Sequence, residues 1–318
     1  MTDPARAAAE AAAGLSIANH EVYWDRVESS DGVFDASVLA RMATDRDTFA
    51  AAGLRLVLEP GLHEPPTYVR RLPHAQYRAQ DGSFAGTNVI WSTDVRQRVE
   101  RYIRVLNATL DFSRYSAIRL GAAGDVEVLY PGNSLFWAFD AVAQATGCPA
   151  PGWAPGNTTL DAVGVAAWYD WYLDSLIGEI VWRRNLFRSL GFAGDFLLVM
   201  PGIGALPSAA RAALDSNLTL YADVMGRGAT WLLLLQRLVP AMGGPDRLVA
   251  WCSSTAEGYR QDDISAPGDA VLDPSDPVLS TWSSMRLMSY YADRLGITKG
   301  GENPGCVLWL RDDEGLTI

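Results

Sequence analysis

The sequence predicts an α/β protein with an incomplete (β/α)8 TIM barrel, in which strands two to seven can be placed and strands one and eight are not found. Strand-like apolar segments alternate with helical segments six times, which is typical of parallel strands joined by crossover helices. Polar and aromatic residues follow nearly every strand, as they do around the mouth of a barrel active site. A dinucleotide-binding sheet is disfavoured, because Gly202-x-Gly204 and Gly226-x-Gly228 lack the third glycine of that fold's phosphate-binding turn.

The first half of the chain supplies three helices and three strands. Apolar residues recur with helical periodicity in the second of these helices, and glycines stand where the first two helices end. The predicted elements are a helix over 4–13 ended by Gly14, a strand over 15–22, a helix over 36–52 ended by Gly53, a strand over 54–58, a helix over 93–111 and a strand over 116–121.

The second half repeats this alternation with longer pieces. Two of its helices also end at a glycine, which is a common helix stop. The predicted elements are a helix over 162–190 ended by Gly191, a strand over 195–200, helical segments over 208–239, a strand over 247–252, a helix over 277–295 ended by Gly296, and a short strand leading into Gly300.

Composition limits the classes of partner. The chain has 318 residues, of which 49% are hydrophobic and 20% charged, and we expect one catalytic barrel domain over 1–318. Its formal charge of −11 argues against nucleic acid or an anionic membrane surface, because both require a basic face. No apolar run approaches the roughly 20 residues of a membrane span. Without a secretion signal in this sequence, a cytoplasmic location is expected unless the N-terminus is truncated.

Counting elements against an eight-stranded template leaves a gap. The helix over 4–13 takes the place of the first barrel helix, and only 16 residues follow Glu302. Six strands cannot close an eight-stranded barrel, so two edges would be exposed and would favour association. Three explanations are open: the chain is truncated at both ends, a second chain closes the gap in an oligomer, or the sheet is open.

Two glutamates are the candidate catalytic pair. Glu127 ends the segment Gly121-Ala-Ala-Gly-Asp-Val-Glu after one strand, and Glu302 lies within Gly300-Gly-Glu-Asn-Pro-Gly after the last. A glutamate after a strand is most often a solvated loop residue, but the specialised backbone around these two favours a function. Residues at the ends of different strands can meet across a barrel mouth, and glycoside hydrolysis needs two carboxylates that flank the scissile bond.

Four motifs in this order resemble clan A glycoside hydrolases, particularly the β-galactosidase-like members. They are the segment Tyr23-Trp-Asp-Arg-Val-Glu28 with Gly32-Val-Phe-Asp35, the segment over 54–66 with Tyr68-Val69, the segment Gly124-Asp-Val-Glu-Val-Leu-Tyr-Pro131, and the segment Gly301-Glu-Asn-Pro-Gly305. They are similar to the family's regions after strand two, at strand three, at the strand-four acid/base and at the strand-seven nucleophile. The Glu-x-x-Tyr-Pro spacing also resembles that of β-amylases.

The resemblance implies a retaining double displacement on a β-linked sugar without a cofactor. Glu127 would be the general acid/base and Glu302 the nucleophile. The family usually carries Asn immediately before the acid/base, where this chain has Val126. Either another residue makes the contact of that Asn with the sugar 2-hydroxyl or the chemistry differs, and Asp125 is the alternative acid.

Further side chains near the strand ends are candidates for contacting sugar. Histidines could hydrogen-bond sugar hydroxyls and aromatic rings could stack on sugar C–H faces, with packing in the core as the alternative. The candidate substrate-binding residues are His20, Tyr23, Trp24, His63, Asp125, Tyr130, Trp137 and Asn303. The three histidines lack metal-ligand spacing, so no metal site is expected.

Three functions are therefore compatible with the sequence, and all three have a carbohydrate partner. The first is the retaining β-galactosidase-like hydrolase acting on an oligosaccharide, a polysaccharide or a small glycoside. The second is an inverting, β-amylase-like hydrolase, whose carboxyl groups should stand farther apart. The third is a barrel remnant that binds carbohydrate without catalysis.

Overall fold

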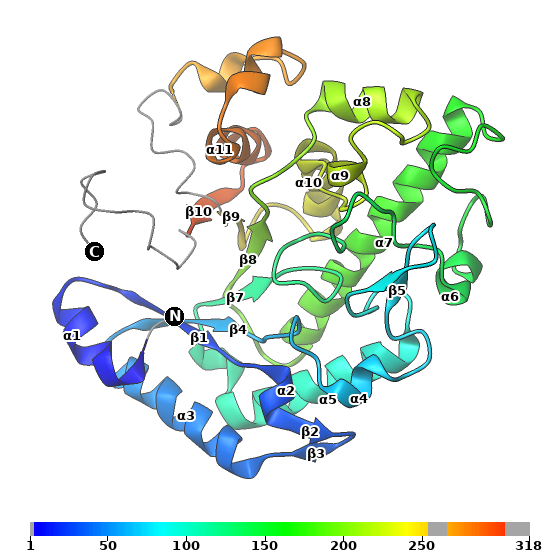
Figure 1. Ribbon diagram of the computed structural model, residues 1–318. Helices are drawn as coiled ribbons and strands as arrows, with labels where there is room; N and C mark the ends of the chain where they lie inside the picture. The colour runs from blue at the N-terminus through cyan, green and yellow to red at the C-terminus, as the bar shows by residue number, and fades with distance from the viewer. Residues whose placement is uncertain (1–2, 254–265, 303–318) are drawn as a thin grey trace, which may run out of the picture.

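The computed structural model describes residues 3–253 and 266–302, which contain one curled sheet of six parallel strands. The sheet order is β1-β4-β7-β8-β9-β10, so neighbours in the sheet follow one another along the chain. The strands are β1 (Ile17–Glu21), β4 (Arg55–Glu59), β7 (Ala117–Leu120), β8 (Asp195–Met200), β9 (Leu248–Cys252) and β10 (Thr298–Gly301). Each lies within the segment predicted for it or within a few residues of it. The prediction of an incomplete (β/α)8 barrel with six placed strands is confirmed (Figure 1).

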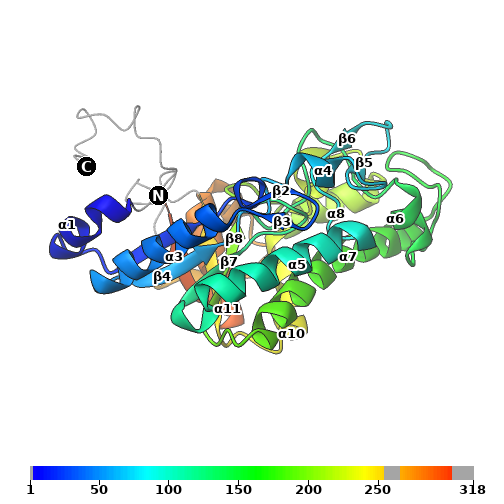
Figure 2. The ribbon, with the colours of Figure 1, turned by 90° about the horizontal axis from the view of Figure 1, so that it is seen from below.

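Crossover helices cover the outer face of this sheet, and Figure 2 shows several of them side by side below the strands. Their first turns begin at capping side chains, for example Asp35, Ser92, Asp161 and Ser283, each of which accepts a hydrogen bond from a backbone N–H of the first turn. The helices are α1 (Ala7–Ala12), α3 (Ala36–Ala51), α5 (Thr93–Leu110), α7 (Ala162–Ser189), α8 (Pro207–Asp215), α9 (Ala222–Met225), α10 (Trp231–Ala241) and α11 (Ser284–Leu295).

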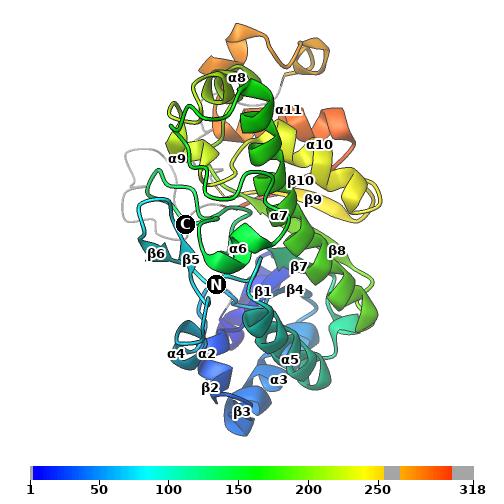
Figure 3. The ribbon, with the colours of Figure 1, turned by 90° about the vertical axis from the view of Figure 1, so that its right-hand side faces the viewer.

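Short elements lie mainly in the loops after the strands. Figures 1 and 3 show α4, α6 and the ribbon β5–β6 beyond the carboxyl ends of the strands. The short elements are α2 (Trp24–Val27), β2 (Glu28–Ser30), β3 (Val33–Phe34), α4 (Thr67–Arg70), β5 (Tyr77–Arg78), β6 (Phe84–Ala85), α6 (Ala141–Ala145), and the 3-10 turns η1 (Pro4–Arg6), η2 (Phe112–Arg114), η5 (Asp269–Val271) and η6 (Pro277–Thr281).

Two predicted helices are interrupted in the structure. The helical stretch over 208–239 is divided into α8, α9 and α10, with the left-handed residues Tyr221 and Gly228 at the breaks. The helix predicted over 277–295 begins as the turn η6 and becomes α-helical only after Ser283, which is extended and caps α11. Left-handed or extended backbone cannot continue an α-helix, so the chain changes direction at these residues.

The two faces of the sheet carry two cores. Outward-pointing side chains join the helices in one large apolar core, whereas inward-pointing ones form a small cluster of Val57, Ala117, Leu197 and Val249 with Trp251 against it. Because side chains alternate along a strand, the residues two positions after Val57 and Ala117 point into the barrel at its mouth. Among the described residues, no helix combines the length and the apolar character needed to cross a bilayer.

Candidate active site

Charged residues occupy the inward positions directly above the small inner core. Glu21 of β1 is the register partner of Glu59 of β4, and Arg119 of β7 lies two residues beyond Ala117, the register partner of Val57. Parallel strands bring their carboxyl ends to one rim, so these three side chains lie side by side at the mouth.

Arg119 joins carboxylates from two other strands. Its Nε lies 3.2 Å from Oε2 of Glu59, while its two Nη atoms donate to the two carboxylate oxygens of Glu302 at 2.5 and 2.6 Å. Burial alone would lower the pKa of Arg119, but the hydrogen bonds to Glu302 and the charge of Glu59 raise it above the usual value. Because β8 and β9 separate β7 from β10 in the sheet, the Arg119–Glu302 pair spans the inside of the barrel mouth.

Glu127 approaches the same place from the loop after β7. The Ser253 hydroxyl donates to Oε1 of Glu127 at 2.5 Å, and the backbone N–H of Glu302 donates to the carbonyl of Cys252 at 2.9 Å. The two glutamates predicted from the sequence are therefore attached to adjacent residues at the end of β9. Burial raises the pKa of Glu127, and the charges of Asp125 and Glu302 act in the same direction, while the Ser253 hydrogen bond opposes them.

The backbone of the Glu127 loop requires glycine at two positions. A Cβ on Gly121 would lie 2.2 Å from the Asp125 carbonyl oxygen, and a Cβ on Gly124, where φ is +75°, would lie 2.8 Å from the Thr87 carbonyl oxygen. The Asp125 carboxylate accepts the backbone N–H of Glu127 at 3.1 Å. The loop is thus tightly folded, and the Asp125 carboxylate orients the backbone of Glu127.

A buried ion pair on α7 supports this loop from beneath. Nε of Arg183 lies 2.5 Å from Oε1 of Glu179, and Nη2 of Arg183 donates to the carbonyl oxygen of Gly121. Both side chains are almost fully buried, so the Gly121 carbonyl receives a charged donor away from water.

Three of the predicted substrate-binding residues lie around an accessible pocket or beside it. A pocket of about 240 Å³ is lined by His63, Arg70, Gln76, Gly86, Thr87, Gly124 and Asp125. The half-buried ring of Tyr23 meets the ring of His63 edge-on, with centroids 6.3 Å apart. The pKa of Tyr23 is raised to about 12, mainly by burial and secondly by a hydrogen bond to Glu21. Its hydroxyl is therefore protonated at neutral pH.

Four other predicted substrate-binding residues lie in the core, which is the alternative left open for them in the sequence. Their rings are at most 4% exposed and offer no face to a sugar in this structure. Their polar atoms are bonded inside the protein: Nδ1 of His20 lies 2.7 Å from the Tyr115 hydroxyl, Trp24 donates to Glu28, Tyr130 to the Tyr172 carbonyl, and Trp137 to the Pro131 carbonyl. Burial lowers the pKa of His20 to about 4, consistent with a neutral packed ring. Asn303 lies outside the described residues.

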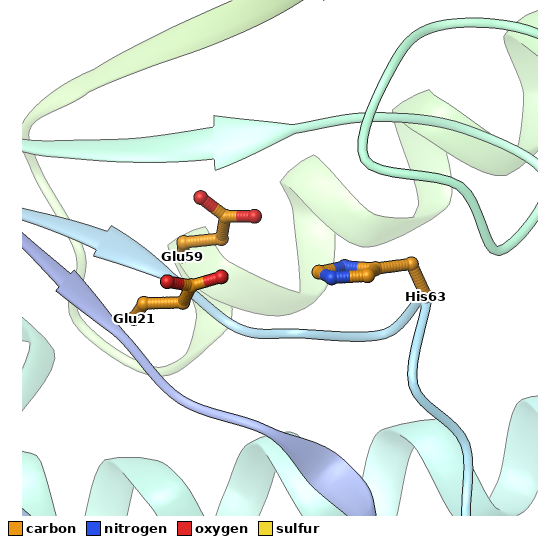
Figure 4. A group of neighbouring side chains, drawn as sticks. All are labelled: Glu21, Glu59 and His63. Carbon is orange, nitrogen blue, oxygen red and sulfur yellow. The ribbon is translucent and has the colours of Figure 1, made fainter. Parts of the chain in front are cut away.

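Four residues of this site were not predicted from the sequence: Arg119, Glu21, Glu59 and Ser253. One signal was available: Arg119 interrupts the apolar strand Ala-Ile-Arg-Leu, and an arginine on the inner face of a buried strand needs a partner. No metal site was expected from the spacing of the histidines. The structure groups one ligand atom each from Glu21, Glu59 and His63 within 4.8 Å of one another (Figure 4). Spacing could not reveal this grouping, because strand register brings the residues together.

Comparisons with known proteins reveal similarity at the level of the fold. No family model matches the sequence, and no curated protein is a significant match to it. A β-galactosidase from the Antarctic haloarchaeon Halorubrum lacusprofundi superposes with a TM-score of 0.51 and 15% identity, covering 94% of this chain and 50% of that one. A β-galactosidase from the psychrophilic Marinomonas ef1 gives a TM-score of 0.50 and 13% identity, covering 82% and 40%. The chain thus spans half or less of these two enzymes, and at such identities the likeness shows a shared barrel fold.

Proposed function

We propose that this chain is the greater part of a retaining glycoside hydrolase barrel, with Glu127 as general acid/base and Glu302 as nucleophile. The observation that carries the proposal is the contrast between two glutamates attached to the same strand end. Burial favours the protonated form of Glu127, whereas Glu302 is paired through both oxygens with Arg119. The reaction requires one carboxyl group that donates a proton and a second carboxylate that attacks the sugar.

The proposed reaction has two steps at one sugar carbon. Glu127 donates its proton to the leaving-group oxygen while a carboxylate oxygen of Glu302 forms a bond to the anomeric carbon. Glu127, now ionised, takes a proton from water, whose oxygen displaces Glu302 and releases the sugar. Arg119 stabilises the carboxylate of Glu302 before attack and after release.

The proposed substrate is a β-linked sugar held by the pocket that Gly124 and Asp125 line, two residues of the loop that carries Glu127. His63 and Asp125 line that pocket and can bond hydroxyl groups, and Tyr23 offers the partly accessible ring beside them. The fold shared with two β-galactosidases supports a β-galactoside as the first substrate to examine. An inverting reaction and carbohydrate binding without turnover are the alternatives.

Activity of Glu127→Gln and Glu302→Gln on aryl β-glycosides tests the assignment. We expect Glu302→Gln to lose turnover of all substrates, because no covalent intermediate can form. Glu127→Gln should lose about 10²–10⁴-fold on substrates with poor leaving groups. It should still release a dinitrophenolate rapidly, because that leaving group needs no proton.

A control variant and the product anomer complete this experiment. Glu100 forms an exposed ion pair with Arg104 on α5, so Glu100→Gln should retain full activity. Unchanged turnover in either site variant would refute the assignment. NMR detection of the inverted anomer as first product would select the inverting alternative, and saturable sugar binding by a wild-type protein without turnover would select the binding remnant.

A further inference from the structure

Glu21, Glu59 and His63 come together at the barrel mouth from two strand ends. Glu21 and Glu59 are register partners on adjacent parallel strands, and His63 follows β4 by four residues. Figure 4 shows both carboxylates turned towards the imidazole ring. One nitrogen and two oxygens thus lie within 4.8 Å of one another, and together they form a mixed donor set rather than a purely acidic one.

We propose that these three residues bind one divalent transition-metal cation of the Zn²⁺ or Mn²⁺ class. Such ions lie about 2.0–2.2 Å from nitrogen and carboxylate ligands, so small rotations of the two glutamate side chains would close the triad around one ion. Imidazole among carboxylates favours these ions over Mg²⁺ and Ca²⁺, which prefer oxygen alone. This site goes beyond the proposed hydrolysis and does not depend on it.

Glu59 is oriented for such a role by its neighbours. It is 6% exposed, and its contacts with Nε of Arg119 at 3.2 Å and with Nδ2 of Asn19 at 3.3 Å are both made through Oε2. The hydrogen bond from Asn19 and the ion pair with Arg119 both hold Oε2, which orients the carboxylate and leaves the other oxygen for a metal, an arrangement common around protein-bound ions.

The local charges also favour a cation. Glu21, Glu59 and Glu302 surround the single guanidinium of Arg119, so three negative charges meet one positive charge. Like charges on directly opposite strand positions repel each other. A divalent cation would balance the surplus.

Titration of the chelator-treated full chain with Zn²⁺ by calorimetry, and with Mn²⁺ by electron paramagnetic resonance, tests the site. We expect one equivalent to bind. The affinity should fall at least about tenfold in His63→Ala and in Glu21→Gln, since each removes one ligand. Co²⁺ should give a visible absorption band that His63→Ala alters.

His74→Ala is the matched control, because His74 is exposed and lies outside the triad. It should bind Zn²⁺ as the wild type does, and circular dichroism should show that every variant is folded. Absence of binding by the wild type would overturn the proposal, as would equal affinity in wild type and His63→Ala. Glu127→Gln should bind Zn²⁺ normally, so failure of the hydrolase assignment and failure of the metal site are separately visible.

Discussion

Arg119 makes more contacts across the barrel mouth than a lysine could make at the same position. Its planar guanidinium reaches Glu59 through Nε and both oxygens of Glu302 through the two Nη atoms. An ammonium group lacks this fork geometry, so it cannot hold the two carboxylates at once. A lysine at position 119 would keep the positive charge but would not keep the contacts with both Glu59 and Glu302.

We expect Arg119→Lys to lower the free energy of unfolding by about 1.5–3 kcal/mol, the range for losing a hydrogen bond to a charged group, because the positive charge stays but the fork geometry is lost. Turnover should fall as well, because Glu302 loses its bidentate partner. Urea unfolding and aryl-glycoside kinetics measure the two effects. Arg104→Lys, in an exposed pair with Glu100, should change stability by less than about 0.5 kcal/mol. Equal effects of the two substitutions would contradict the importance assigned to the Arg119 geometry.

Single residues also show where sequence reasoning stops. Glu127 and Glu302 could be found because unusual glycine-rich backbone surrounds them after predicted strands. Tyr23 and Trp24 are adjacent and equally aromatic, yet the first is half-buried beside His63 and the second is fully buried against Glu28. The direction of each ring depends on the backbone path after β1, which cannot be predicted from the types of the two residues.

At the scale of elements, α7 combines a packing role with support of the Glu127 loop. The buried pair Glu179–Arg183 lies between the helix and the carbonyl of Gly121. Removing only one member would leave the other as an uncompensated buried charge. The pair is therefore a point where a helix substitution can disturb the site.

We expect Arg183→Met to destabilise the protein by about 3–5 kcal/mol, because Glu179 is left charged and buried. The double substitution Glu179→Leu with Arg183→Met should recover much of that loss, since no unpaired charge remains. Urea unfolding of both variants gives the comparison. A double variant no more stable than Arg183→Met alone would show that the carbonyl contact, and not the charge pairing, dominates.

Elements were more predictable than the contacts between them. Apolar runs marked β4, β7, β8 and β9, because buried parallel strands are apolar on both faces, whereas β1 is only partly apolar and β10 reads Thr-Lys-Gly-Gly. The division of 208–239 depends on left-handed backbone at Tyr221, which no rule for tyrosine predicts. The Glu21–Glu59 pairing depends on the register of β1 against β4, and register emerges only when the sheet assembles.

At the scale of the whole molecule, two buried glutamates contribute to the change of stability with pH. Burial raises the pKa of both Glu127 and Glu59, so the folded protein holds these protons at a pH where the unfolded chain has released them. In this pH range the folded state binds more protons than the unfolded state. The free energy of unfolding therefore falls as pH rises from the unfolded-state pKa, near 4.5, through the raised folded-state pKa. These two groups therefore favour folding most at low pH, opposite to a carboxylate whose pKa is lowered in the folded state.

We expect Glu127→Gln to gain stability relative to the wild type as pH rises from 4 to 7. Glutamine resembles the protonated carboxyl and loses no proton, so the cost of ionising a buried group disappears. Urea unfolding of both proteins across this pH range measures the difference. Glu100→Gln, at an exposed position, should show no comparable trend. A constant difference between Glu127→Gln and wild type at all pH values would contradict the raised pKa.

The ion pair between Arg119 and Glu302 also determines how the last strand is held. Within the described residues β10 pairs in the sheet with β9 alone, and no closed ring of backbone hydrogen bonds joins it to β1. The Arg119–Glu302 pair connects the end of β10 directly to β7 across the mouth. The separation of these two sides of the mouth therefore depends on an ion pair as well as on backbone hydrogen bonds.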